Sequence, residues 1–200
     1  MEDIRALSRC LLAERQHESF TDEGRSVAAV LVLLYEHLGE EHILLQVRTD
    51  LVVHHKGEIS LPGGARDAVD DSLVATALRE TQEEIGVSPE HVEVFGPLDY
   101  VATIRSNFLI APFVGAITKR GKYPFRTADR EVRELLEVPL TDLRGERSGS
   151  WSANETYGEL TPQRSFRYGE HLIWGATARI LGQYLDLIAG ECSDPLELPR

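Results

Sequence analysis

The chain has 200 residues, 42% of them hydrophobic, which is enough for one well-packed domain. Its 33 Asp and Glu residues outnumber its 21 Lys and Arg residues, giving a formal net charge of −12. Such a chain repels polyanions on average, which argues against a protein that coats nucleic acid or binds a membrane surface, but not against one that binds a small anionic ligand through a metal ion.

The N-terminal 24 residues predict a helical extension ahead of the main domain. Ile4, Leu7, Leu11 and Leu12 recur at helical spacing and are followed by polar residues. This charged segment lacks the apolar region of a signal peptide, and the longest apolar run, residues 27–35, is too short to span a membrane. The two cysteines lie far apart without metal-ligand spacing, so we expect a cytoplasmic protein.

A β-hairpin and a glycine-rich loop are predicted next. Residues 26–35 and 43–48 are rich in Val and Leu and flank a turn at Gly39. A polar stretch over residues 49–60 then leads to the sequence Leu-Pro-Gly-Gly at residues 61–64. Glycine allows backbone angles and close approaches that a side chain would block, so this loop is a candidate binding element.

The segment after this loop predicts a helix. It begins at Asp71 or Ser72, either of which can cap it, and ends at Gly86. One face of this helix is expected to be buried, and that face carries Val74, Leu78, Thr81 and Ile85. A separate arc of the same helix carries the charged residues of its last two turns.

Three glutamates, Glu80, Glu83 and Glu84, crowd this arc beside Arg79. Like charges one turn apart repel one another, and the negative end of the helix dipole disfavours them further. Carboxylates that converge beside a glycine-rich loop are hard oxygen ligands of the kind that Mg²⁺ and Mn²⁺ prefer. We therefore expect these three carboxylates to converge on a divalent metal ion, with a solvated acidic face as the alternative.

The rest of the chain predicts further strands and a terminal helix, so that an α/β domain covers residues 25–190 and a flexible tail covers residues 191–200. An antiparallel pair, with its turn at 105–107, is expected from residues 92–103 and 108–118. Around Pro139, residues 131–136 and 140–143 predict short helical or irregular pieces. The elements expected after them are strands over 151–157 and 165–173 and an amphipathic helix over 175–189.

The loop and the acidic helix together resemble the Nudix box. That pattern reads Gly, five residues, Glu, seven residues, Arg-Glu, an apolar residue, any residue, Glu-Glu, any residue, Gly and an apolar residue. Residues 79–80, 83–84 and 86–87 match it in register, with Thr81 where an aliphatic residue is usual. One extra residue lies between Gly64 and Arg79, and Asp70 or Asp71 stands in place of the first glutamate.

Two further segments, residues 44–64 and 171–181, resemble the coenzyme A pyrophosphatase branch of the Nudix hydrolases, which tolerates both the extra residue and the aspartate. The resemblance implies an α/β fold, the Nudix α/β/α sandwich with a mixed sheet. It also implies metal-dependent hydrolysis of the diphosphate linkage of coenzyme A or acyl-coenzyme A. Val53 and Glu58 depart from that branch, which carries an arginine and a glutamine at these positions.

The resemblance also implies roles for individual residues. The expected ligands of Mg²⁺ or Mn²⁺ are Glu80 and Glu84, joined by Glu83 and the carbonyl of Gly64. The expected catalytic residues are Glu83, Glu84 and Arg79, where Glu83 is a ligand or a base that orients water and Arg79 holds the carboxylates in place. The expected substrate-binding residues are Arg48, His55, Lys56 and Gly63. Glu131 is a candidate second base or metal ligand, with a solvated charge as the alternative.

The expected partner is a small nucleotide substrate. We expect binding neither to nucleic acid nor to a membrane, and the formation of a homodimer is left as an open alternative. Within the same chemistry, ADP-ribose, dinucleotides and oxidised nucleoside triphosphates are alternative substrates. A non-catalytic Nudix-fold sensor of nucleotides is an alternative of another class, although such sensors usually lack an intact box. A purely structural α/β domain would leave the cluster of like charges unexplained.

Overall fold

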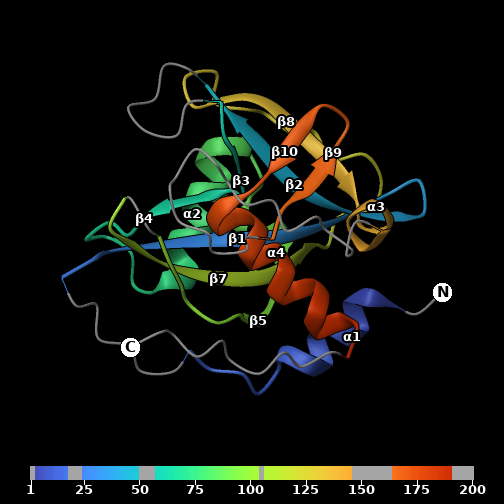
Figure 1. The fold of residues 1–200 in the computed structure, drawn as a ribbon, viewed down its shortest axis with the longest axis horizontal. Coiled ribbons are helices and arrows are strands. Elements are labelled where there is room, and N and C mark those ends of the chain that lie inside the picture. The colour runs from blue at the N-terminus through green and yellow to red at the C-terminus, as the bar shows by residue number, and fades with distance from the viewer. Residues whose placement is uncertain (1–2, 18–23, 50–56, 104–105, 146–163, 191–200) are drawn as a thin grey trace.

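The computed structural model describes residues 3–17, 24–49, 57–103, 106–145 and 164–190. Within these ranges a mixed β-sheet forms the centre of the molecule, with helices on both of its faces (Figure 1). The predicted tail over 191–200 and the strand predicted over 151–157 lie outside the described residues.

The sheet is built around two long strands, β1 (Ser26–His37) and β7 (Phe108–Ile117), which run parallel to each other. All other pairs are antiparallel, so the sheet is mixed. The order is β3-β2-β1-β7-β5, with β4 beside β1, β6 beside β7 and β8 beside β2. These strands are β2 (Glu40–Arg48), β3 (Ile59–Ser60), β4 (Gly63–Ala65), β5 (Val92–Pro97), β6 (Val101–Ala102) and β8 (Val132–Pro139).

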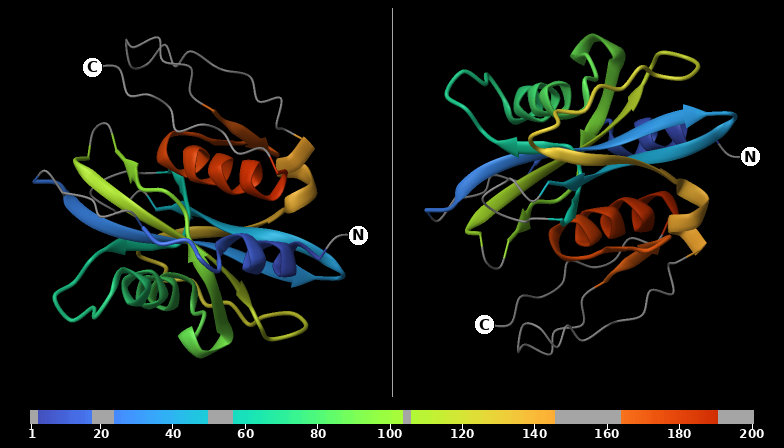
Figure 2. Two further views of the ribbon diagram at one scale, coloured as in Figure 1. Left: turned by 90° about the horizontal axis from the view of Figure 1, so that it is seen from below. Right: turned by 90° about the horizontal axis from the view of Figure 1, so that it is seen from above.

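Two helices cover the two faces of this sheet: α2 (Leu73–Ile85) lies on one face and α4 (Gly175–Ile188) on the other (Figure 2). The expected α/β/α sandwich with a mixed sheet is therefore confirmed. The smaller elements are α1 (Ile4–Leu12), a 3₁₀ turn (Pro89–His91), α3 (Leu140–Gly145) and the hairpin of β9 (Phe166–Tyr168) and β10 (His171–Ile173). None of the helices in the described part of the chain is long and apolar enough to cross a membrane.

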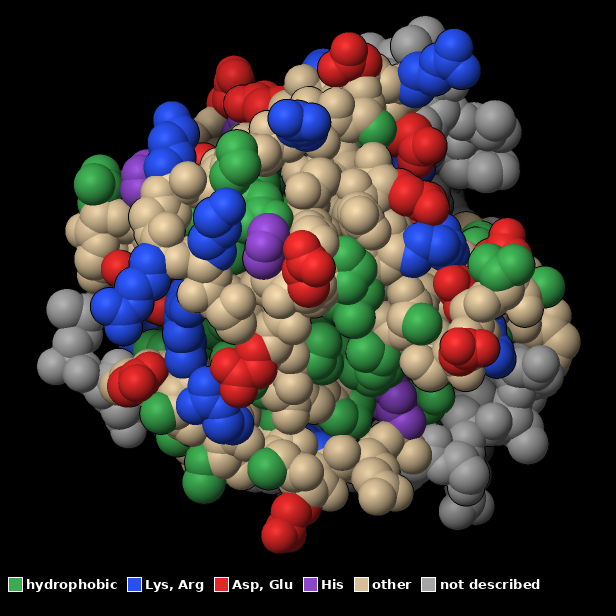
Figure 3. Space-filling view, turned by 180° about the vertical axis from the view of Figure 1, so that it is seen from behind, with side chains coloured by type: hydrophobic (Ala, Val, Ile, Leu, Met, Phe, Trp, Pro, Cys, Tyr) green, Lys and Arg blue, Asp and Glu red, His purple; other side chains and the backbone are tan. Residues whose placement is uncertain are grey.

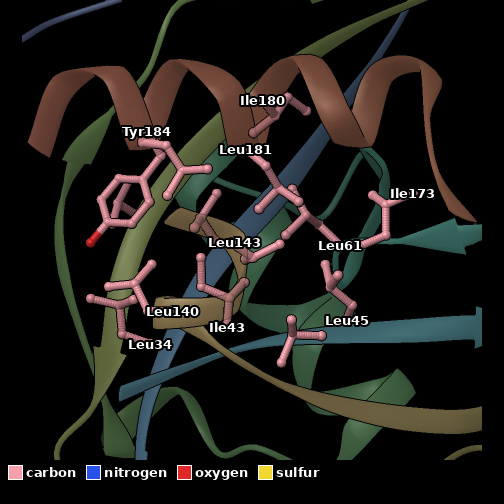
Figure 4. Close-up of a cluster of buried hydrophobic side chains, with 14 of the residues drawn as sticks. Leu34, Ile43, Leu45, Leu61, Leu140, Leu143, Ile173, Ile180, Leu181 and Tyr184 are labelled. Atoms are coloured by element: carbon pink, nitrogen blue, oxygen red, sulfur yellow. The ribbon is translucent and has the colours of Figure 1, made fainter. Parts of the chain in front are cut away.

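Strand alternation separates the core into two apolar clusters, one on each face of the sheet. Along β1, Leu31 and Leu33 pack on the α2 side, whereas Val32 and Leu34 pack on the α4 side. On the α4 side, side chains of the helix meet side chains of the sheet and of α3, as Figure 4 shows. The labelled residues there are Leu34, Ile43, Leu45, Leu61, Leu140, Leu143, Ile173, Ile180, Leu181 and Tyr184. This largely apolar interface fixes the sheet against α4, and the charged residues of the acidic helix lie on the other face.

The molecular surface on the α2 side carries acidic and basic side chains that are interspersed (Figure 3). Both signs of charge are therefore present on the face where the acidic helix lies. The anionic character of the chain as a whole does not form a uniform negative surface there.

Most of the predicted elements are confirmed. The hairpin around Gly39 is β1 and β2, and the helix predicted from Asp71 or Ser72 is α2, with Ser72 as its cap. The irregular pieces predicted for residues 131–136 are wrong, because this segment forms the first part of strand β8 and pairs with β2. The sequence Glu-Val-Arg-Glu-Leu-Leu favours a helix locally, but pairing with β2 buries Val132 and Leu136 and overrides that preference.

Candidate active site

The acidic helix α2 is held at both ends. At its beginning, the Ser72 side chain accepts a hydrogen bond of 3.1 Å from the backbone N–H of Ala75. At its end, Gly86 adopts a left-handed conformation with φ of 73°, which closes the helix. The backbone N–H of Ala128 also donates to the carbonyl of Glu84 at 2.9 Å. The last turn is therefore anchored by a distant loop despite its crowded charges.

The glycine-rich loop needs both of its glycines, for different reasons. Gly63 has φ of +146°, and a Cβ there would lie 2.3 Å from the carbonyl oxygen of Ala29 on β1. A Cβ on Gly64 would lie 2.5 Å from the carboxyl carbon of Glu80. Gly63 therefore allows β4 to approach β1, and Gly64 leaves the space that the Glu80 carboxylate occupies.

Replacement of Gly64 by Ala is expected to displace the Glu80 carboxylate and to lower turnover by about tenfold or more. A matched control is Gly145→Ala in α3, where a Cβ meets no atom within 4 Å among the described residues. Steady-state rates and melting temperatures of both variants would check this. Wild-type turnover in Gly64→Ala would contradict the role given to this space.

Glu84 is the most buried carboxylate of the helix, with 2% of its surface exposed. Its Oε2 accepts a hydrogen bond of 2.8 Å from the backbone N–H of Gly63, and its Oε1 lies 3.5 Å from Nη1 of Arg48. Burial raises the pKa of Glu84 to about 7, against the opposing effects of Gly63, the Gln46 side chain and Arg48, and the charge of Glu80 raises it further. The protein neighbours of Glu84 thus compensate the negative charge of its ionised form only in part.

Arg79 holds several acceptors at once. It donates two hydrogen bonds to Asp70, from Nε at 2.9 Å and from Nη2 at 3.0 Å. Its Nη1 donates to Glu80 at 2.8 Å and to Glu83 at 3.1 Å, and Nη2 also donates to the carbonyl of Ala65 at 3.2 Å. The guanidinium therefore fixes the helix carboxylates relative to the glycine-rich loop.

Of the two aspartates considered for the missing glutamate, Asp70 is the one that contacts Arg79. Asp70 is only 6% exposed, whereas Asp71 is exposed. Its Oδ2 also accepts hydrogen bonds of 2.9 Å from the Thr76 hydroxyl and from the backbone N–H of Asp67. The hydrogen bonds from Arg79, followed by that from Asp67, hold the pKa of Asp70 well below its usual range. Asp70 is thus a permanent anion that fixes the guanidinium.

The three glutamates of the helix do not share one environment. Burial raises the pKa of Glu80; Arg79 opposes this shift, and the charges of Glu83 and Glu131 add to it. The Glu83 side chain is 59% exposed and reaches back to Arg79. Within the described residues no three Asp, Glu, His or Cys side chains converge as a ready metal-binding group. The metal-ligand roles of these glutamates stay predictions.

Glu131 and the other predicted site residues lie as follows. Glu131 is exposed in the turn before β8, and its charge reaches Glu80. His55 and Lys56, predicted to bind substrate, lie outside the described residues, as does Val53. The structure thus brings together the loop, α2 and Arg48 at the end of β2, and it places Glu131 at their border.

Comparison with known proteins identifies the group to which this architecture belongs. Residues 25–157 match the model of the NUDIX domain. The chain belongs to the Nudix family. A curated relative, "Uncharacterized Nudix hydrolase NudL" of Salmonella paratyphi B, is 33% identical over 177 residues, which are 88% of either chain.

A solved structure shares this fold. A MutT/nudix family protein from Enterococcus faecalis superposes with a TM-score of 0.57 at 15% identity, over 88% of this chain and 66% of that one. The Nudix hydrolase RenU of M. smegmatis gives a TM-score of 0.49 at 24% identity, over 68% of this chain and 80% of that one. As a Nudix hydrolase, the protein is a pyrophosphohydrolase.

Sequence reasoning did not single out one polar residue beneath this Nudix box. Gln46 on β2 is completely buried and influences the pKa of Glu84. The sequence signal for it is a lone amide inside the apolar strand Ile-Leu-Leu-Gln-Val, where burial of a polar side chain is unfavourable unless that side chain is hydrogen-bonded.

Proposed function

We propose that this Nudix hydrolase cleaves the diphosphate linkage of coenzyme A or acyl-coenzyme A, with Mg²⁺ or Mn²⁺ held by Glu80 and Glu84. Glu83 and the carbonyl of Gly64 complete the proposed ligand set. The observation that carries this proposal is the arrangement of two partly or fully buried carboxylates against a glycine-rich loop, where Gly64 lacks a side chain and the Glu80 carboxylate takes its place.

The residues present fit a hard divalent cation. Glu84 is buried, and the Gly63 N–H at 2.8 Å, Arg48 at 3.5 Å and the Gln46 side chain offset its charge only in part, so that burial raises the pKa of Glu84 as it does that of Glu80. Carboxylate and carbonyl oxygens are the ligands that Mg²⁺ and Mn²⁺ prefer. A bound ion would supply the positive charge that neutralises the diphosphate and acidifies the attacking water.

The protein groups have separate tasks in the proposed reaction. Arg79, itself fixed by Asp70, orients Glu80 and Glu83. To the exposed carboxylate of Glu83 we assign, besides or instead of its role as a ligand, the orientation of a water molecule or the acceptance of its proton. The water oxygen forms a bond to one phosphorus while the bridging P–O bond breaks, so that coenzyme A yields 3′,5′-ADP and 4′-phosphopantetheine. Arg48, with 23% of its side chain exposed beside Glu84, is a proposed phosphate contact.

The coenzyme A substrate is supported by the combined likeness of the stretch before the box, the longer box and the junction before α4. Val53 and Glu58 weigh against it, because an arginine that contacts phosphate directly is lost and a carboxylate is added. We therefore propose that activity on coenzyme A is present but broadened towards other nucleoside diphosphate derivatives. A hydrolysis screen with Mg²⁺ or Mn²⁺ across coenzyme A, ADP-ribose, dinucleotides and nucleoside triphosphates tests this directly.

Restoring the missing arginine with Val53→Arg is expected to lower the KM for coenzyme A by about tenfold, and the KM for ADP-ribose by less, because a phosphate contact is regained. Val53→Lys is a matched control, since it adds the charge without the bidentate fork. Initial rates with both substrates would measure the change. If the wild-type protein hydrolyses ADP-ribose well and leaves coenzyme A untouched at millimolar concentration, the substrate proposal is wrong while the metal-site proposal stands.

A further inference from the structure

A polar strip interrupts the apolar interface between the sheet and α2. Alternate residues of a strand share one face, so Leu44, Gln46 and Arg48 of β2 all face α2. Leu44 packs in the apolar cluster on that side, and Arg48 reaches Glu84. Gln46 lies between them and is 0% exposed. The face therefore changes from apolar to charged by way of a buried amide.

Two neighbouring polar side chains, one on β2 and one on β3, have buried polar atoms without a hydrogen-bond partner. Among the described residues, Nε2 and Oε1 of Gln46 and Oγ of Ser60 are buried atoms without one. Gln46 and Ser60 are paired directly across β2 and β3, so their side chains project from the same face, with Cβ atoms about 5 Å apart. Three orphan polar atoms thus lie within one small region beneath Glu84.

Packing alone does not explain a glutamine here. Burying an amide without partners is unfavourable, and an apolar side chain of the same length would fill the same space without that cost. Gln46 also lies close to the Glu84 carboxylate, as does Arg48 two residues further along the same face of β2. The position of Gln46 therefore suggests that its amide interacts with the Glu84 carboxylate.

We propose that Gln46 is a positioning residue of the metal site, which together with the Gly63 N–H holds the Glu84 carboxylate in the orientation that a divalent ion requires. This inference rests on the proposed function. An ionised carboxylate only accepts hydrogen bonds, so the Gln46 amide must present its Nε2–H groups to Glu84. The Ser60 hydroxyl can then donate to Oε1 of Gln46 and so keep the amide from turning over. Small rotations of these side chains would complete a chain of hydrogen bonds from Ser60 through Gln46 to Glu84.

The test uses the full chain with Gln46→Met, which keeps the length and removes the amide, and Ser60→Ala. Ser8→Ala is the matched control, because the Ser8 hydroxyl is also 0% exposed and hydrogen-bonded, but to Tyr184 between α1 and α4. Three quantities are measured: the Kd of Mn²⁺ by calorimetry, the melting temperature of the metal-free protein, and kcat and KM for the best substrate of the screen.

Gln46→Met is expected to weaken Mn²⁺ binding by about tenfold and to lower kcat with little change in KM, as for other residues that orient metal ligands. Ser60→Ala is expected to do the same more weakly, and the double variant to be no worse than Gln46→Met, since both act through one amide. Ser8→Ala should lower the melting temperature and leave the Kd of Mn²⁺ unchanged. This pattern would support the proposal.

Wild-type affinity for Mn²⁺ in Gln46→Met would overturn the inference. The proposed function is tested separately by Glu84→Gln in the same titration. If Glu84→Gln loses affinity and Gln46→Met does not, only the role of Gln46 is wrong. If the wild-type protein itself binds no Mn²⁺, both the metal-site proposal and the role of Gln46 are overturned.

Discussion

Replacement of Glu84 by Gln is expected to lower turnover by about a hundredfold or more while the fold is retained. The change keeps the shape of the side chain, and the amide oxygen of the new side chain can still accept the hydrogen bond from Gly63. It removes the buried charge that we propose as the main attraction for the metal ion. Rates measured across a series of Mg²⁺ concentrations, with circular dichroism to verify the fold, would show this.

The same variant is expected to be more stable than the wild-type protein in metal-free buffer above pH 7. Burial raises the pKa of Glu84 to about 7 from its ordinary value of 4.5, so between these values the folded protein binds more protons than the unfolded chain. The free energy of unfolding of the wild-type protein therefore falls by about 3 kcal/mol as pH rises through this window and then levels off, through this group alone. In Glu84→Gln this decrease in the free energy of unfolding does not occur, because the new side chain does not titrate.

The difference in unfolding free energy between the two proteins is the quantity to measure, by denaturant titration at pH 5 and pH 8 in the presence of EDTA. It should grow with pH in favour of Glu84→Gln. Glu170→Gln, at an exposed position in the turn between β9 and β10, is a control and should change neither stability nor activity. Full activity of Glu84→Gln at limiting Mg²⁺ would show that the metal assignment is wrong.

Replacement of Arg79 by Lys is expected to lower both the activity and the melting temperature. Arg79 donates to Asp70, Glu80, Glu83 and the carbonyl of Ala65, whereas the single ammonium of Lys cannot reach all of them. Asp70 would keep its burial and lose its bidentate partner. By analogy with other residues that orient metal ligands, we expect turnover to fall by about 10- to 100-fold.

Arg126→Lys is the control for this variant, because Arg126 is exposed and lies near the C-terminal end of α2. Asp70→Asn should act in the same direction as Arg79→Lys, and the effects of the two changes should be less than additive, since they break one ion pair. The pKa of Asp70 is depressed, so the stability from this pair is present above the ordinary pKa of an aspartate and is lost as pH falls below it. Additive effects at pH 8 would contradict the coupling of Asp70 to Arg79.

The local elements of the site can be predicted from the amino-acid sequence. The spacing of apolar residues predicts α2, Gly86 predicts its end, and the crowding of like charges in its last turns indicates a cation. The glycines before the helix indicate a loop that other groups approach closely, and Gly63 and Gly64 both have such neighbours. These features depend on residues within a few turns of one another, so short-range geometry is sufficient to predict them.

The distant residues that complete the site follow from the packing of the folded chain. It selects Asp70 over Asp71 as the partner of Arg79, buries Glu84 while Glu83 stays exposed, and places Gln46 beneath Glu84. It also makes a strand of residues whose local preference is helical, because β8 pairs with β2. The physical reason is common to these cases: burial and pairing depend on which face of the sheet meets which face of the helix, and the packing of segments far apart in the chain determines that contact.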